Sequence, residues 1–142
     1  MATSSEKLRV LIIEDDDDVA SIIRGAIQLV HTTWSLFRAR NGKEAQSLIS
    51  SGVEQGAAFD LIVSDWVLPG KSGFELLKSL RADAATVATP FLMVTGCAHD
   101  LMMPMAQTAG VSGFLAKPFT EDELLGAIDA ALGYTPPVRA VG

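Results

Sequence analysis

The chain has 142 residues, of which 49% are hydrophobic and 20% are charged, and its 17 acidic residues outnumber its 11 basic ones to give a net charge of -6. This composition is typical of a globular protein that buries a core and excludes a disordered chain. The length predicts one domain, and we expect no second effector domain. Because nucleic-acid binding depends on clustered Lys and Arg, the acidic charge argues against a nucleic-acid partner.

Other classes of protein are excluded by features that the sequence lacks. No apolar run approaches the ~20 residues of a membrane span, and residues 1–9 are polar, without the apolar stretch of a signal peptide. The single cysteine, Cys97, can form neither an internal disulfide nor, by itself, a thiolate metal cage. We therefore expect a cytoplasmic protein that has no membrane partner.

The first half of the chain predicts two strands, each followed by a helix. Residues 8–13 form an almost continuous apolar run that stops at the acidic residues 14–18, the profile of a strand buried on both faces. Apolar residues between 19 and 30 recur at helical spacing and predict an amphipathic helix. Residues 34–39 predict the second strand. The apolar residues of a second, short helix are Ala45, Leu48 and Ile49, and a loop over residues 50–58 follows it.

The third predicted strand, residues 61–63, stops at Ser64-Asp65. Pro69-Gly70 then breaks the chain. Ser72 and Glu75 have the spacing of a capping box, in which each side chain accepts a hydrogen bond from the other residue's backbone N–H, and they predict the start of a helix. The residues that this helix is expected to turn inward are Phe74, Leu77 and Leu80.

The last part of the chain predicts two more strands and a closing helix. Residues 91–94 form the fourth strand, which ends at Thr95-Gly96, and residues 113–116 form the fifth, which ends at Lys117-Pro118. A second capping box spans residues 120–123 and predicts the start of the closing helix. Its expected core-facing residues are Leu124, Leu125, Ile128, Ala131 and Leu132.

Strands and helices alternate along the chain, which predicts a parallel sheet that is covered by helices on both faces and joined by right-handed crossovers. We expect the folded domain to occupy residues 1–133. Residues 134–142 are expected to form a short flexible tail, too short to be a domain of its own.

Polar side chains follow most of the predicted strands at the point where each strand ends. Glu14 and Asp15 end the first strand, Asp65 the third, Thr95 the fourth and Lys117 the fifth. Ligands of an open parallel sheet bind at the carboxyl ends of its strands, so we expect these groups to converge at one edge. Neighbouring carboxylates raise one another's pKa and destabilise the fold unless a cation offsets them.

The chemistry of this edge favours phosphoryl transfer. Hard oxygen ligands suit Mg2+, which takes one or two carboxylates and keeps its other positions for water and a phosphoryl group. A carboxylate beside Mg2+ is also a competent nucleophile toward phosphorus and forms an aspartyl phosphate. This transfer needs charge neutralisation at the phosphoryl oxygens, which the metal, Lys117 and the Thr95 hydroxyl are able to supply.

Each of these residues has an ordinary explanation when it is taken alone. The acidic run 15–18 is compatible with a solvated helix cap, and we keep that interpretation for Asp17 and Asp18. Taken alone, Asp65 is usually a turn residue at a strand end, Thr95 an ordinary strand threonine and Lys117 a surface lysine. Their joint occurrence at the ends of several strands favours the functional interpretation.

Several segments are similar to those of the response-regulator receiver family in its CheY-like form. The matching segments are residues 11–16, 64–66 with Pro69 and Gly73, 75–83, 92–95 and 117–119. The resemblance covers about residues 7–133. It implies an α/β fold of the flavodoxin-like (CheY-like) type, a doubly wound five-stranded parallel sheet with strand order 2-1-3-4-5 and five helices.

The resemblance also implies roles for the acidic residues. Asp65 would accept a phosphoryl group from the phosphohistidine of a histidine kinase in a Mg2+-dependent reaction. Asp15, Asp65 and the backbone carbonyl of Val67 would ligate Mg2+, and Glu14 would hold the metal through water.

A switch is implied in the same way. The resemblance makes Thr95 the switch threonine, Phe114 the rotating aromatic and Lys117 the phosphate-binding lysine, with a cis bond between Lys117 and Pro118. Phosphorylation would draw the Thr95 hydroxyl inward, and Phe114 would fill the vacated space, which is a population shift. Because Phe114 lacks the hydroxyl of the commoner tyrosine, it should bury more readily, which predicts a less sharply two-state aromatic.

The chain departs from the family around Pro104, which lies inside the family's fourth helix, here residues 100–109. Proline is tolerated best in the first turn of a helix, so we expect this helix to be shortened or to begin near Pro104. A flexible apolar cluster surrounds it, comprising Leu101, Met102, Met103 and Met105. Methionines more often fill gaps in a core, which is our first interpretation, and a docking surface at the family's output face is the alternative.

Two further positions resemble the family's tuners of autodephosphorylation. They are Val67 and Cys97, which lie two residues beyond Asp65 and Thr95. Neither side chain readily positions an attacking water. We therefore expect a long-lived phosphoaspartate.

The sequence as a whole predicts a stand-alone phosphoacceptor switch, not an enzyme beyond intrinsic self-phosphorylation and autodephosphorylation. Its expected partners are a sensor histidine kinase or histidine phosphotransfer protein and a downstream protein target. One alternative is a phosphorelay shuttle from Asp65 to a histidine phosphotransfer protein. Another is a Mg2+-dependent phosphohydrolase, but its haloacid dehalogenase type needs an Asp where this chain has Val67. No glycine-rich nucleotide-binding loop is present, so we expect no nucleotide cofactor.

Overall fold

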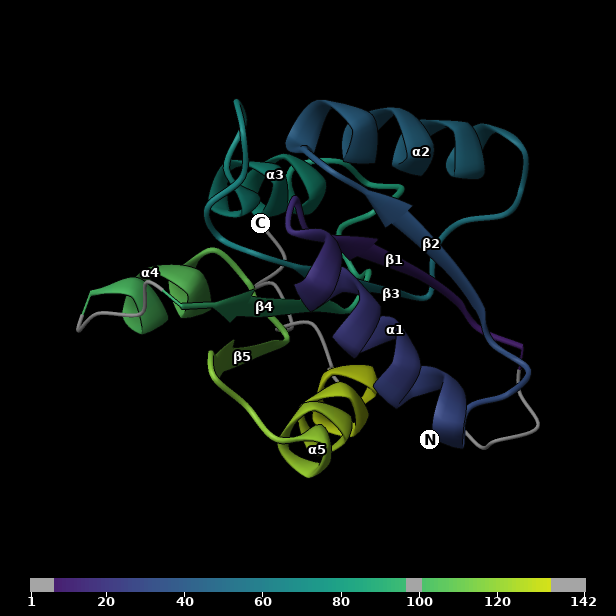
Figure 1. Cartoon of the computed structure of the whole chain (residues 1–142). Helices are drawn as coiled ribbons and strands as arrows, with labels where there is room; N and C mark the ends of the chain where they lie inside the picture. Colours follow the sequence, from purple (N-terminus) through teal and green to yellow (C-terminus); the bar gives the residue numbers. More distant parts are fainter. Residues whose placement is uncertain (1–6, 97–100, 134–142) are drawn as a thin grey trace.

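The computed structural model of the protein describes residues 7–96 and 101–133. Within these residues, five strands alternate with five helices (Figure 1). In chain order the elements are β1 (Arg9–Ile13), α1 (Asp17–Val30), β2 (Ser35–Ala39), α2 (Gly42–Glu54), β3 (Leu61–Ser64), α3 (Gly73–Arg81), β4 (Phe91–Thr95), α4 (Met102–Thr108), β5 (Gly113–Ala116) and α5 (Glu121–Leu132). The predicted tail 134–142 and the Cys97 prediction lie outside the described residues.

All strand pairs are parallel, and the sheet has the order β2-β1-β3-β4-β5. This order confirms the predicted fold class. It places β1 between β2 and β3, so the acidic segment after β1 has a neighbouring strand on each side. In the β1–β3 register Ile13 lies opposite Ser64, and therefore Glu14 and Asp65 leave the sheet side by side.

Both faces of the sheet are buried under helices (Figure 1). Along β1, Val10 and Ile12 belong to the hydrophobic cluster beneath α1 and α5. Leu11 and Ile13 belong to the cluster on the other face, beneath α2 and α3. Successive side chains of a strand point to opposite faces, so a strand buried on both faces needs the continuous apolar run seen in the sequence.

Four of the five helices begin with side-chain caps, and at α2 the Asn41 side chain accepts a hydrogen bond from the Glu44 backbone N–H. The Asp16 carboxylate accepts hydrogen bonds from the backbone N–H groups of Asp18 and Val19 at the start of α1. The capping boxes predicted at 72–75 and 120–123 are both present, at α3 and α5. Each cap satisfies N–H groups that have no partner inside the helix, which fixes where the chain turns from loop to helix.

The prediction of a loop over residues 50–58 was wrong in its first part, because α2 continues to Glu54. Serine and glycine in this stretch have low helix propensity, but tertiary packing outweighs that preference. Ile49 and Gly52 are buried, and a Cβ atom at Gly52 would meet the carbonyl oxygen of Ala57 at 2.7 Å. The returning chain therefore packs directly on the last turn of the helix.

The inward faces of α3 and α5 differ in detail from the prediction. In α3 the buried leucines are Leu76, Leu77 and Leu80. Phe74 is only half-buried, and its ring stacks on Trp66, which packs against the edge of the cluster beneath α2 and α3. In α5, Leu125 is also only half-buried. The remaining predicted core residues of α5 are buried or packed against the core, and they are Leu124, Ile128, Ala131 and Leu132.

The shortened fourth helix is confirmed. The helix α4 has 7 residues and begins at Met102, so Pro104 is its third residue, two positions later than the first-position placement we had expected. The first N–H that bonds back within this turn belongs to Met105, which donates to the Leu101 carbonyl at 3.1 Å. Pro104 therefore occupies a position whose N–H would have no helical acceptor.

The interpretation of the methionine cluster as core filling was wrong for three of its four residues. Met102 is buried, with 5% of its surface exposed. Leu101, Met103 and Met105 are 67%, 45% and 42% exposed. The buried residues of α4 are Met102 and Ala106, which share one side of the helix, and the apolar side chains on its other sides face solvent. Among the described residues no helix is long and apolar enough to cross a membrane.

Candidate functional site

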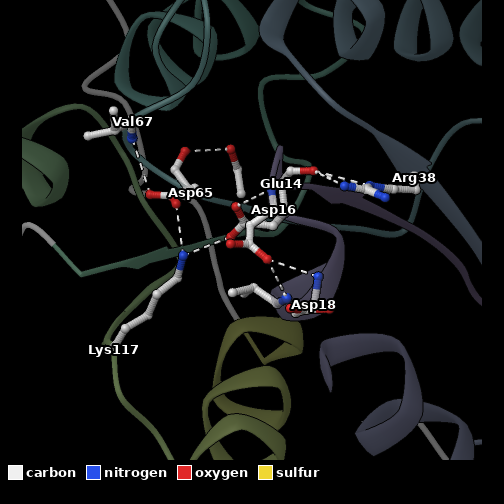
Figure 2. Close-up of polar contacts among 9 residues, drawn as sticks. Glu14, Asp16, Asp18, Arg38, Asp65, Val67 and Lys117 are labelled. Atoms are coloured by element: carbon white, nitrogen blue, oxygen red, sulfur yellow. Dashed lines mark hydrogen bonds and ion pairs between the residues drawn. The ribbon is translucent and has the colours of Figure 1, made fainter. Parts of the chain in front are cut away.

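The ammonium group of Lys117 lies between two carboxylates at the carboxyl edge of the sheet (Figure 2). Its Nζ donates to Asp65 Oδ2 at 2.8 Å and to Glu14 Oε1 at 2.7 Å. The side chains of Lys117, Asp65 and Glu14 are only 20%, 11% and 3% exposed. The structure thus brings together three of the residues that the sequence singled out, in a partly desolvated cluster.

Strand order explains how residues so far apart in sequence meet. Glu14 and Asp65 follow the adjacent strands β1 and β3, and the Asp65 N–H donates to the Ile13 carbonyl at 3.0 Å. Lys117 follows β5, and its backbone N–H is held by the Thr95 carbonyl at 2.9 Å. The lysine side chain is long enough to reach past the end of β4 to the two carboxylates.

Asp65 is fixed by the loop that follows it. Its Oδ1 accepts a hydrogen bond from the Val67 N–H at 3.2 Å, and its backbone carbonyl accepts one from the Ser64 hydroxyl at 2.9 Å. Gly73, the first residue of α3, donates to the Trp66 carbonyl at 2.8 Å. A Cβ atom at Gly73 would collide with the Asp65 carbonyl oxygen, so this close approach requires glycine. Gly73 contributed to the family resemblance, but its contact with Asp65 was not foreseen.

Burial and charge act in opposite directions on the cluster. Burial raises the pKa of Glu14, although hydrogen bonds from Lys117 and from the Asp16 N–H act against it. Burial lowers the pKa of Lys117, but the hydrogen bonds to Asp65 and Glu14 outweigh it, and the net pKa is raised. Lys117 is therefore a permanent cation near neutral pH, and its charge stabilises the buried Glu14 carboxylate.

The other predicted site residues lie around this cluster. Asp15 is exposed beside Glu14, and Val67 is 54% exposed beside Asp65. Thr95 is fully buried at the end of β4. Phe114 lies opposite Met93 in the β4–β5 pair and is half-buried against the cluster beneath α2 and α3. The Lys117–Pro118 bond is cis, as predicted.

One residue at this edge was missed at the sequence level. Arg38 of β2 donates from Nε and Nη2 to the Glu14 carbonyl oxygen at 3.1 and 2.8 Å (Figure 2). Its Nη1 also donates to Asp17 Oδ1 at 2.7 Å. An arginine in a strand has the sequence pattern of an ordinary surface residue. The predicted strand order could have identified Arg38, because a β2 strand that lies beside β1 places the end of β2 next to the acidic segment.

The donor set of this edge suits a hard divalent cation. Glu14, Asp15 and Asp65 supply carboxylate oxygens from the ends of two adjacent strands, and oxygen ligands of this kind are those that Mg2+ prefers. In residues 7–96 and 101–133, no group of three or more His, Cys, Asp and Glu side chains is placed to hold a metal ion. The predicted Mg2+ site does not require such a group of three side chains. Only Asp15 and Asp65 would ligate the ion directly through side chains, and the third protein ligand would be the Val67 carbonyl.

Comparison with known proteins identifies the family of this chain. Residues 10–129 match the family model of the response regulator receiver domain. The chain belongs to this family. The receiver domain is 34% identical over 122 residues to the chemotaxis protein CheY of Pseudomonas aeruginosa, which covers 86% of this chain and 94% of that protein. It is 30% identical over 128 residues to CheY-3 of Vibrio cholerae, with 90% and 94% covered.

Solved structures show the same fold. The receiver domain matches the chemotaxis response regulator CheY4 of Vibrio cholerae with a TM-score of 0.76 and 27% identity over 89% of this chain and 99% of that one. It matches the non-phosphorylated HemR receiver domain of Leptospira biflexa with a TM-score of 0.77 and 26% identity over 94% and 100%. The predicted family and fold class are therefore confirmed.

Proposed function

We propose that this receiver domain is a phosphorylation-controlled signalling switch in which Asp65 accepts a phosphoryl group from the phosphohistidine of a sensor histidine kinase or a histidine phosphotransfer protein. The observation that carries this proposal is the contact of Lys117 with Asp65 and Glu14 at the carboxyl edge of the sheet. A partly buried aspartate with a fixed cation on one oxygen has the means to bind a phosphoryl group and to balance its charge.

The chain's own residues suffice to describe the transfer. An Asp65 carboxylate oxygen attacks the phosphorus, a new O–P bond forms, and the P–N bond to the donor imidazole breaks, with its electron pair leaving on the imidazole nitrogen. Lys117 stays in reach of the phosphoryl oxygens, because its Nζ already lies 2.8 Å from Asp65 Oδ2. The Val67 N–H orients the other carboxylate oxygen. Positioning and charge balance are the main requirements of this reaction.

We propose that Mg2+ assists at this edge. Asp15, Asp65 and the Val67 carbonyl would hold it directly, and Glu14 would hold it through water. When bound, the ion would neutralise part of the negative charge that accumulates on the phosphoryl oxygens. The buried Glu14 carboxylate, whose pKa burial raises, would gain a second counter-charge beside Lys117.

The proposed output is a change at the end of β4 and on β5. Thr95 and Phe114 lie on neighbouring strands, and Phe114 is only half-buried, so it has room to bury further when Thr95 moves toward a phosphorylated Asp65. A surface formed by α4, β5 and α5 would then bind a downstream protein. Equal burial of Phe114 with and without the phosphate mimic beryllofluoride would contradict this switch.

A role as a relay shuttle is compatible with the same chemistry and differs in the fate of the phosphoryl group. Incubation of phosphorylated protein with a histidine phosphotransfer protein separates the two roles, since a shuttle returns labelled phosphate to the partner's histidine. The phosphohydrolase alternative is weaker, because Val67 supplies no acid–base group next to Asp65 and its side chain is apolar and exposed.

The proposal is tested by incubating the protein with acetyl phosphate and Mg2+ and locating a base-labile phosphoryl adduct by mass. We expect the adduct on Asp65, and its absence in Asp65→Asn. The matched control is Asp60→Asn, because Asp60 precedes the same strand, β3, at its opposite end and accepts a hydrogen bond from the Arg9 N–H. An adduct that persists in Asp65→Asn, or one that disappears equally in Asp60→Asn, would contradict the assignment.

A further inference from the structure

We propose that Arg38 is a positioning residue that holds the acidic loop, defined here as residues 14–17, in the arrangement needed to bind a divalent cation beside Asp65. The cation rests on the proposed function above, whereas the positioning of the loop rests on contacts within the chain. Arg38 does not belong to the set of residues that the family resemblance assigned to the site.

The contacts start where the β1–β2 ladder ends. Ile13 and Ala39 are the last register pair of these strands, and the Glu14 N–H donates to the Ala39 carbonyl at 3.0 Å. Beyond this point the chain after β2 turns away into α2, whose cap is Asn41. The Glu14 carbonyl oxygen is then held by the Arg38 guanidinium, through Nε at 3.1 Å and Nη2 at 2.8 Å. The side chain thus takes the place of a neighbouring strand.

The same guanidinium also holds the other end of the acidic loop. Its Nη1 donates to Asp17 Oδ1 at 2.7 Å, and Asp17 is the first residue of α1. Arg38 is therefore bonded to both ends of the loop, and its side chain is only 21% exposed. Arg40 also contacts Asp17 Oδ1, at 2.9 Å, but its side chain is 57% exposed, and no contact between Arg40 and Glu14 is found among the described residues.

The backbone that Arg38 fixes carries Glu14 and Asp15, two of the oxygen donors expected at the metal. Arginine suits this task because its planar fork can donate to one carbonyl and one carboxylate in a fixed geometry, whereas lysine has a single flexible ammonium group. Groups that orient metal ligands from outside the coordination sphere typically change metal affinity when they are removed. We therefore expect the loss of Arg38 to weaken cation binding without removing a ligand.

If Arg38 acted only through its charge, replacing it would change the affinity for a cation in the opposite direction, so the two roles can be distinguished by experiment. Arg38 is a cation close to the acidic loop, so removing its charge should strengthen the binding of another cation if electrostatics were its only role. Positioning predicts weaker binding after the same substitution. Arg40 is the matched control, because its removal deletes one positive charge beside Asp17 and leaves the Glu14 carbonyl contacts in place.

The experiment is a titration of the full chain with MgCl2 alone, followed by Trp66 fluorescence in a Trp34→Phe background and repeated by calorimetry. In Arg38→Met we expect the dissociation constant for Mg2+ to rise about tenfold or more. Arg38→Lys keeps the charge and loses the fork, and should lie between Arg38→Met and the wild type. Arg40→Met should bind Mg2+ as tightly as the wild type or more tightly. Circular dichroism checks that each variant is folded, and Arg38→Lys carries the test if Arg38→Met does not fold.

A second measurement needs no metal. Amide hydrogen exchange at Asp16, Asp18 and Val19 should speed up in Arg38→Met and stay unchanged in Arg40→Met, because only the first variant releases the Glu14 carbonyl. Unchanged or tighter Mg2+ binding in Arg38→Met, beside a normal response of the wild type, would overturn this inference and leave the proposed function standing. If the wild type shows no response to Mg2+, the Mg2+ site of the proposed function is contradicted. In that case equal amide exchange rates in the wild type and Arg38→Met would also overturn the positioning role of Arg38.

Discussion

The indole of Trp66 stacks on the ring of Phe74, with the ring centroids 4.8 Å apart and 7° between the ring planes. This stack joins the residue that follows Asp65 to the first turn of α3. Phe74 also lines a cavity of about 470 Å³ together with residues of α3 and α4, among them Lys78, Pro104 and Met105. Trp66, the neighbour of Asp65 in sequence, therefore contacts through Phe74 one wall of a cavity that α4 also lines.

Trp66 should report on the occupation of Asp65. We expect its fluorescence to change when Mg2+ and beryllofluoride are added, because the new charge lies one residue away, and to stay constant in Asp65→Asn. The measurement is best made in a Trp34→Phe background. Trp34 is 5% exposed and stacks on His31 in the cluster on the opposite face, so its emission is an unrelated background. A response that survives Asp65→Asn would show that Trp66 senses another site.

The stability of the protein should depend on the ionisation of Glu14 with a defined sign. Burial raises the pKa of Glu14 above its ordinary value of 4.5, so the folded state binds this proton more tightly than the unfolded chain does. The contribution of Glu14 to the free energy of unfolding therefore increases as the pH falls through the raised pKa, and it decreases toward neutral pH. We expect the free energy of unfolding of the wild type minus that of Glu14→Gln, measured by urea unfolding, to increase as the pH is lowered from about 8 to about 4.5.

Glu75 supplies a control with the opposite sign. The hydrogen bond from the Ser72 backbone N–H lowers the pKa of Glu75, which sits in the capping box of α3. Its contribution to stability is present above the unfolded pKa of 4.5 and is lost as the pH falls through the lower, folded value. The free energy of unfolding of the wild type minus that of Glu75→Gln should therefore decrease as the pH is lowered. The same trend for both variants would contradict the raised pKa of Glu14.

Gly73→Ala should damage the site through the backbone of Asp65. The added Cβ would meet the Asp65 carbonyl oxygen, so either α3 or the Asp65 loop has to move. Overpacking of this kind costs ~1–3 kcal/mol in unfolding free energy, and we expect phosphorylation by acetyl phosphate to slow as well. Gly126→Ala is the matched control, since a Cβ atom at Gly126 in α5 has no atom within 4 Å. It should stabilise the helix by up to about 1 kcal/mol.

The exposed methionines of α4 should be dispensable for folding. Met105→Gln replaces a side chain that is 42% exposed, and a surface substitution of this kind changes the free energy of unfolding by no more than ~0.5 kcal/mol. Met102→Ala removes a side chain that is 5% exposed and should cost ~2–5 kcal/mol. Equal losses of stability in urea unfolding would show that Met105 belongs to the core after all.

Local patterns in the sequence determined the elements and most of their ends. The apolar run of β1 predicted a strand buried on both faces, because two faces can be buried only when successive residues are all apolar. The capping boxes at 72–75 and 120–123 predicted the starts of α3 and α5, since a cap satisfies N–H groups through neighbours in sequence. The polar residues after the strands predicted which edge holds the site.

Only the tertiary structure decided which of those residues touch. The contact of Lys117 with Glu14 and Asp65 depends on the order of β1, β3, β4 and β5, and no local pattern encodes which strands are neighbours. The same holds for Arg38, whose partner at Glu14 lies across the β1–β2 pair, and for Gly73, whose role depends on the path of the Asp65 loop. Residue types and spacings set the chemistry that was available, and the packing of distant segments set the distances at which it acts.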